Sequence, residues 1–112
     1  MALTVLIVDD ERHIVEVLAG LLEDEGYAVR RAYDGNVALQ EVEAAPPDLV
    51  LSDVMMPRLG GVELARRLIS LGIPVVLMSA AAADPKLAGV AFISKPFDLE
   101  QVLAVAGDIL GR

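Results

Sequence analysis

The sequence predicts an α/β protein whose parallel sheet is covered by helices on both faces. Short apolar runs alternate with longer segments of helical periodicity along the 112 residues. The apolar runs lack the every-second-residue polar pattern of a strand with one wet face, which indicates strands buried on both faces. Strict alternation of strand and helix implies parallel pairing through right-handed crossovers. A doubly wound parallel sheet is therefore expected.

Four elements are expected in the first half of the chain. Leu3–Val8 is almost entirely aliphatic or β-branched and predicts a buried strand. A helix follows from Glu11 to about Glu25, with Val17 counted among the apolar residues on its inner side. Tyr27–Tyr33 is the second strand, and Val37–Ala45 is a short helix ended by two prolines.

The second half repeats the pattern. Asp48–Ser52 is the third strand, and Val62–Leu71 is an amphipathic helix. Ile73–Met78 and Val90–Ile93 are the fourth and fifth strands. Leu99–Leu110 is the last helix, and the aspartate that precedes it is its expected N-cap.

The crossover between the fourth and fifth strands is unusually short. Only ten residues, Ala80–Gly89, separate Ser79 from Val90, which is at the lower limit for a connection that includes a helix. Asp84 and Pro85 could open a single turn. We expect a shortened or missing fourth helix within an otherwise flavodoxin-like (βα)5 fold, with strand order 2-1-3-4-5.

Composition bounds the class of protein. The length suits one domain spanning residues 1–112. A net charge of −8 argues against direct binding to nucleic acid or to an anionic membrane. Cysteine is absent, so thiolate metal sites are excluded. No apolar run approaches the roughly 18 residues at which a membrane span becomes plausible, and a cytoplasmic location is expected.

Polar side chains follow four of the five strands. Asp9 and Asp10 come after the first strand, Asp53 after the third, Ser79 after the fourth and Lys95 after the fifth. Because the carboxyl ends of parallel strands meet at one edge of the sheet, these side chains are expected to share a pocket. Neighbouring carboxylates repel one another unless a cation neutralises them. The cluster predicts a site for a hard divalent metal, with Mg²⁺ as the candidate.

Each of these residues also has an ordinary structural interpretation. Asp9 and Asp10 could be acids favoured by a helix N-terminus, at under about 1 kcal/mol each. Asp53 could be a turn residue, or a carboxylate nucleophile able to form a phosphoryl intermediate. Ser79 could simply end a strand, or its hydroxyl could donate to a phosphoryl oxygen. Lys95 could be a surface lysine, but seven of the nine basic residues are Arg, which suggests a required point charge.

Four motifs together resemble the receiver domain of response regulators in two-component signalling, of the chemotaxis-receiver type. They are Val8-Asp9-Asp10-Glu11, Leu51-Ser52-Asp53-Val54-Met55-Met56-Pro57 with Gly61, Met78-Ser79-Ala80, and Ser94-Lys95-Pro96-Phe97. The resemblance extends over the whole chain.

The resemblance implies how the predicted pocket would bind its metal and its phosphate. Asp53 is similar to the family's phosphoacceptor. Asp10 would bind Mg²⁺ directly and Asp9 through water. Asp53 and the backbone carbonyl of Met55 would complete the protein's share of the ligands.

The remaining family roles concern the phosphoryl group. Lys95 would pair with it, and Ser79 would move toward it on phosphorylation. Phe92 stands at the position of the switch aromatic and would turn inward. The interval from Ser79 to Lys95 is roughly six residues shorter than the family usually shows, and the shortening falls on the crossover.

The function that follows is a phosphoacceptor switch of a two-component system or phosphorelay. Phosphate would pass from a phosphohistidine, on a histidine kinase or histidine phosphotransfer protein, to Asp53 and change a partner-binding surface. Such a domain promotes its own phosphorylation and dephosphorylation without being a conventional enzyme. The alternative is a phosphorylation-independent interaction module with the same fold. An aspartyl-phosphate phosphatase of the haloacid dehalogenase type is disfavoured because its nucleophile lies on the first strand. The output partner and the oligomeric state stay open.

Overall fold

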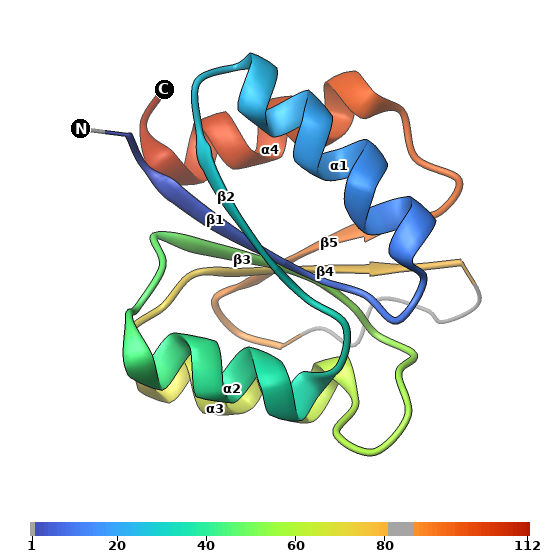
Figure 1. The fold of residues 1–112 in the computed structure, drawn as a ribbon, viewed down its shortest axis with the longest axis vertical. Coiled ribbons are helices and arrows are strands. Elements are labelled where there is room, and N and C mark those ends of the chain that lie inside the picture. The colour runs from blue at the N-terminus through green and yellow to red at the C-terminus, as the bar shows by residue number, and fades with distance from the viewer. Residues whose placement is uncertain (1, 81–86) are drawn as a thin grey trace.

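The computed structural model describes residues 2–80 and 87–112, which contain five strands and four helices (Figure 1). In chain order these elements are β1 (Thr4–Val8), α1 (Arg12–Asp24), β2 (Ala28–Ala32), α2 (Gly35–Ala44), β3 (Leu49–Asp53), α3 (Gly61–Ser70), β4 (Val75–Ser79), β5 (Val90–Ser94) and α4 (Leu99–Leu110). Helices α1 and α4 cover one face of the sheet, and α2 and α3 cover the other (Figure 1).

All strand pairs are parallel, and the order β2-β1-β3-β4-β5 confirms the predicted flavodoxin-like arrangement. The register aligns the carboxyl ends of the strands. Val8 lies beside Ser52, Asp53 beside Met78, and Ser79 beside Ser94. The residues at and just after these ends therefore share one edge of the sheet, as the sequence predicted.

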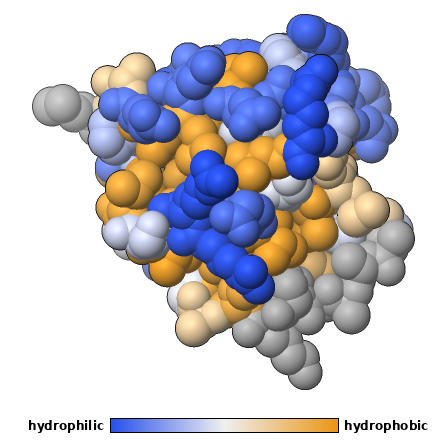
Figure 2. Space-filling model, turned by 90° about the horizontal axis from the view of Figure 1, so that it is seen from below, coloured by the Kyte–Doolittle hydropathy of each residue, from blue (hydrophilic) through white to orange (hydrophobic). Residues whose placement is uncertain are grey.

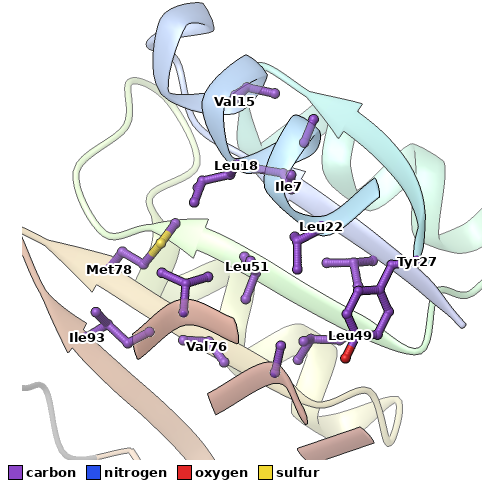
Figure 3. Close-up of a cluster of buried hydrophobic side chains, with 14 residues drawn as sticks. Ile7, Val15, Leu18, Leu22, Tyr27, Leu49, Leu51, Val76, Met78 and Ile93 are labelled. Atoms are coloured by element: carbon purple, nitrogen blue, oxygen red, sulfur yellow. The ribbon is translucent and has the colours of Figure 1, made fainter. Parts of the chain in front are cut away.

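Both faces of the sheet carry an apolar core, which explains why the strands lack polar alternation. On the α1 and α4 side, Val15, Leu18 and Leu22 of α1 point toward Ile7 and Leu51 of the sheet (Figure 3). On the α2 and α3 side, the intervening strand residues pack against the two helices. The buried strand residues on that side are Leu6, Val8, Ala32, Val50, Val75 and Leu77.

The outer surface of the α2 and α3 layer mixes polar and apolar side chains. Figure 2, which views the molecule from this side, shows hydrophilic residues lying across apolar surface. Val37 of α2 and Leu71, the C-cap of α3, are among the exposed large apolar residues. Among the residues described, every helix is too short or too polar to cross a bilayer.

Two details differ from, or lie beyond, the sequence expectations. Val17 is 42% exposed, so placing it on the inner side of the first helix was wrong. The buried positions of α1 are 15, 18, 19 and 22, and residue 17 lies two positions from the first of them, away from that stripe. No helix lies between β4 and β5 within the described residues, and the turn expected at Asp84 and Pro85 falls outside them.

The helix caps follow local side-chain chemistry. Asp98 caps α4 by accepting a hydrogen bond from the Glu100 amide at 3.0 Å, as predicted. Asp34 caps α2 in the same way, accepting from the Val37 amide at 2.8 Å. These caps satisfy amides that have no partner inside their own helices.

Gly20 provides a test of local stability. It lies in the middle of α1, is exposed, and a Cβ added there would meet no atom within 4 Å. We expect Gly20→Ala to raise the free energy of unfolding by about 0.5–1 kcal/mol, because glycine is entropically costly inside a helix. Urea denaturation monitored by circular dichroism would measure the change, and an unchanged or lower midpoint would contradict it.

Candidate functional site

The side chains at the carboxyl edge of the sheet meet around one cavity. Its volume is about 330 Å³, and its lining residues are Asp10, Glu11, Asp53, Met55, Ser79, Ala80 and Lys95. They come from the ends of β1, β3, β4 and β5 and from the loops that follow. Asp9 lies behind this lining and is fully buried. The structure thus brings together all five polar residues that the sequence placed at strand ends.

Lys95 connects two of the acids across the sheet. Its Nζ lies 3.2 Å from Oδ2 of Asp9 and 3.3 Å from Oδ1 of Asp53, and its side chain is 14% exposed. Its backbone amide donates to the Ser79 carbonyl at 2.8 Å, which extends the β4–β5 pairing by one residue. The following bond, Lys95–Pro96, is cis. Lys95 is therefore a partly buried ion-pair residue, and the surface interpretation is excluded.

The two adjacent aspartates have different environments. Asp9 uses both oxygens inside the protein, because Oδ2 pairs with Lys95 and Oδ1 accepts from the Glu11 amide at 2.9 Å. Asp10 is exposed and lines the cavity. Of the two, Asp10 has the freer carboxylate for direct contact with a ligand.

The acids are spaced for a cation. One carboxylate oxygen from each of Asp9, Asp10 and Asp53 lies within 4.8 Å of the other two. Ligands on opposite sides of Mg²⁺ are about 4.2 Å apart, so a small closure or a bridging water would fit one ion among them. With the single positive charge of Lys95 set against three carboxylates, two negative charges remain. A divalent cation balances that remainder.

The charges of the site act on one another. Burial, the largest influence, raises the pKa of the Asp53 carboxyl; Lys95 opposes this rise, and the negative charge of Asp9 adds to it. Burial acts to lower the pKa of Lys95, but attraction to Asp9 and Asp53 together outweighs it, and the net pKa of Lys95 is raised. Burial thus destabilises the charged form of Asp53, whereas the two neighbouring acids stabilise the protonated form of Lys95.

The other predicted residues lie at or near the cavity. Ser79 is 2% exposed and lines the cavity beside Lys95. The side chain of Met55 is largely exposed at the rim. Phe92 is not among the lining residues; it is partly buried against the core on the α2 and α3 side. Sequence reasoning did not single out Glu11 as a lining residue, although it directly follows Asp10.

The loop between β3 and α3 folds tightly back on the strand. The Val54 amide donates to the Met78 carbonyl at 2.9 Å, and the Gly61 amide donates to the Val54 carbonyl at 3.0 Å. A Cβ at Gly61 would overlap the Asp53 carbonyl oxygen and lie 2.8 Å from Cα of Val54. Glycine at this position therefore allows the backbone of the loop to close against the residue that carries the candidate nucleophile.

Comparisons with known proteins agree with this geometry. The family model of the response regulator receiver domain matches residues 5–106 of this chain. The response regulator MprA of Mycobacterium ulcerans is 38% identical over 120 residues, which cover 100% of this chain and 52% of that protein. The response regulator GtcR of Aneurinibacillus migulanus is 40% identical over 117 residues, with 97% of this chain and 48% of that protein covered. The chain spans about half the length of these relatives.

Solved structures show the same fold. A putative response regulator from Chloroflexus aurantiacus superposes with a TM-score of 0.89 at 30% identity, covering 100% of both chains. The chemotaxis protein CheY4 of Vibrio cholerae gives 0.88 at 27% identity, covering 97% of this chain and 99% of that one. With a family model matching nearly the whole chain and response regulators among its relatives, this chain belongs to the response regulator receiver domain family of two-component signalling.

Proposed function

We propose that this receiver domain is a cytoplasmic phosphoacceptor switch in which Asp53 accepts phosphate from a phosphohistidine of a histidine kinase or phosphotransfer protein. One observation carries the proposal. The Asp53 side chain is 9% exposed at a cavity edge, with a lysine on one oxygen and two further acids nearby. That combination provides a nucleophile, a cation for the phosphoryl oxygens and a place for a metal.

The residues divide the chemistry among them. An oxygen of Asp53 attacks phosphorus, and the new P–O bond forms as the P–N bond to the donor histidine breaks and the imidazole leaves with that electron pair. Lys95 pairs with the phosphoryl oxygens, and the Ser79 hydroxyl donates to one of them. Such transfer depends mainly on positioning and on charge neutralisation.

The acidic residues prepare the site for Mg²⁺, which supplies neutralisation of phosphoryl charge when bound. Asp10, Asp53 and the backbone carbonyl of Met55 would hold it directly. Asp9, whose oxygens are engaged by Lys95 and the Glu11 amide, would act through water. Ser79 and Phe92 would then respond to the new phosphoryl group by moving inward.

Direct phosphorylation tests the proposal. We expect acetyl phosphate with Mg²⁺ to add one phosphoryl group to the intact protein, seen by mass spectrometry, and Asp53→Asn to abolish the gain. Asp48→Asn is the matched control, because Asp48 accepts from the Thr4 amide at the opposite edge of the sheet and should leave phosphorylation unchanged. Absence of a mass gain in the folded wild-type protein would sink the proposal and favour the phosphorylation-independent module.

The lifetime of the phosphorylated state is a second expectation. Met55 and Ala80 flank Asp53 at the cavity and offer no polar side chain to orient an attacking water molecule. We expect the aspartyl phosphate to decay slowly after removal of the donor, and Met55→Asn to accelerate the decay. Leu71→Asn makes the same kind of exchange at an exposed position away from the cavity and should not. Decay of the wild-type phosphoprotein within seconds would overturn the expectation.

A further inference from the structure

The segment Ala32–Gly35, here called the β2–α2 junction, contacts both loops that carry the proposed Mg²⁺ ligands. It contributes no residue to the lining of the cavity and none to the group of three acids. The first ligand loop, which holds Asp9 and Asp10, follows β1. The second begins directly after Asp53, the last residue of β3, and holds Met55. The two loops belong to neighbouring strands of the sheet, and the junction follows the strand on the other side of β1.

Contacts with the first ligand loop come from the start of the junction. The Asp9 amide donates to the Ala32 carbonyl at 3.2 Å. The guanidinium carbon of Arg12 lies 4.0 Å from the centroid of the Tyr33 ring, a cation–π contact. Because Arg12 is the first residue of α1, this stack holds the end of the loop that carries Asp10.

Contacts with the second ligand loop come from the end of the junction. Oδ2 of Asp34 lies 3.5 Å from Nη1 of Arg58, a residue held at a φ of 63° that non-glycine residues rarely adopt. A Cβ at Gly35 would overlap the Leu59 carbonyl oxygen and lie 2.9 Å from the Leu59 Cβ. The exposed ion pair is worth little, whereas the backbone contact between Gly35 and Leu59 fixes how closely the loop approaches α2.

We propose that the β2–α2 junction positions both ligand loops and thereby sets the affinity of the site for Mg²⁺; this rests on the proposed function. Mg²⁺ demands near-ideal octahedral geometry at 2.0–2.1 Å, so displacement of either loop by a few tenths of an ångström weakens binding. By linkage, a metal ion that favours the closed arrangement of the loops also favours the contacts of the junction. Tyr33 and Gly35 are thus positioning residues.

Two charge-neutral substitutions isolate this role from electrostatics. Tyr33→Leu removes the stack under Arg12, and Gly35→Ala pushes Leu59 away from α2. Each has a matched control. Tyr27→Leu removes the equivalent stack under Arg112, whose guanidinium lies 4.7 Å from the Tyr27 ring near the start of β2. Gly20→Ala adds the same methyl group to a helix where nothing lies within 4 Å.

Mg²⁺ titration of the unphosphorylated proteins, followed by backbone amide NMR shifts, measures the affinity directly and shows that each variant is folded. We expect the dissociation constant for Mg²⁺ to rise about tenfold in both junction variants, which is the lower end of the effect of losing an outer-shell partner. It should stay unchanged in both controls. The Mg²⁺ concentration for half-maximal phosphorylation by acetyl phosphate should rise in parallel. The rate of phosphorylation by acetyl phosphate at saturating Mg²⁺ should be unchanged in both junction variants.

The failures are distinguishable. If the wild-type protein binds no Mg²⁺, the proposed function fails. If the wild type binds Mg²⁺ and the folded junction variants bind it equally well, or no worse than their controls, the positioning role alone is refuted. Should Gly35→Ala prevent folding, Tyr33→Leu carries the test by itself, because it removes atoms and adds no clash.

Discussion

Replacing Lys95 with methionine is expected to lower the free energy of unfolding by about 3 kcal/mol in the absence of divalent cations. The substitution removes the only ion-pair partner of Asp9 among the described residues, and Asp9 is fully buried. Removing one partner of a buried pair typically costs about 3–5 kcal/mol, because the remaining charge is left uncompensated. The lower figure applies here because Asp53, the other partner of Lys95, lines the cavity and is not fully buried.

Mg²⁺ should recover part of the stability that Lys95→Met loses, since a bound cation supplies positive charge to the same carboxylates. Urea denaturation with EDTA and with Mg²⁺ measures both effects. Arg67→Met is the control, because Arg67 forms its ion pair with Glu63 on the exposed surface of α3, where such a pair is worth under about 1 kcal/mol. Equal urea midpoints for Lys95→Met and wild type in EDTA would refute the argument.

The pH dependence of this difference has a definite sign. Burial raises the pKa of Asp53 above its value in the unfolded chain, so its charge costs stability above the folded-state pKa, and that cost disappears as pH falls through it. Lys95 lowers the pKa of Asp53, so the charged form of Asp53 costs more stability when Lys95 is absent. The gap in stability between Lys95→Met and wild type should therefore narrow as the pH is lowered through the titration of Asp53.

Gly61→Ala is the second substitution with a large expected effect. It should lower the free energy of unfolding by about 2–3 kcal/mol, which is the upper part of the range for overpacking. The added Cβ overlaps the Asp53 carbonyl oxygen, a backbone atom that cannot move without disturbing the end of β3. Because the displaced residue is the proposed phosphoacceptor, the rate of phosphorylation by acetyl phosphate should fall as well.

The adjacent glycine is the matched control for this substitution. A Cβ at Gly60 would lie 3.6 Å from the Val54 carbonyl oxygen, an ordinary contact, and its φ of −74° suits any residue. Because Gly60 is the N-cap of α3, where glycine is preferred to alanine, Gly60→Ala should still cost under about 1 kcal/mol, and it should leave phosphorylation intact. If the two variants have the same urea midpoint, the close approach at Gly61 does not matter.

The strands and the composition of the site could be predicted from sequence because each depends on a local pattern, and the strand order could be predicted because five alternating strands suit one common doubly wound arrangement. A buried parallel strand is recognisable from a short apolar run, and its carboxyl end lies at a known edge of the sheet. The residues that follow Val8, Ser52, Met78 and Ser94 therefore had to meet, whatever the details of packing.

Other properties depend on contacts between distant residues. Asp9 and Asp10 are the same amino acid at successive positions. Only the folded structure, in which Lys95 pairs with Asp9, shows which of the two is buried. The exposure of Val17 depends on where α1 rests on the sheet. Nothing local indicates that Gly35 packs against Leu59, because that contact joins the start of α2 to the loop between β3 and α3, and β2 and β3 are not adjacent in the sheet.

The ion pair between Lys95 and Asp9 joins residues 86 positions apart in the chain. During synthesis, β1 leaves the ribosome long before β5. Asp9 and Asp53 therefore lack their partner Lys95 until β5 pairs with β4. A nascent chain therefore cannot acquire a complete site from its first four strands. Pairing of β5 with β4 completes the sheet and the site together, and under the proposed function a chain without β5 lacks the lysine that would pair with the phosphoryl group.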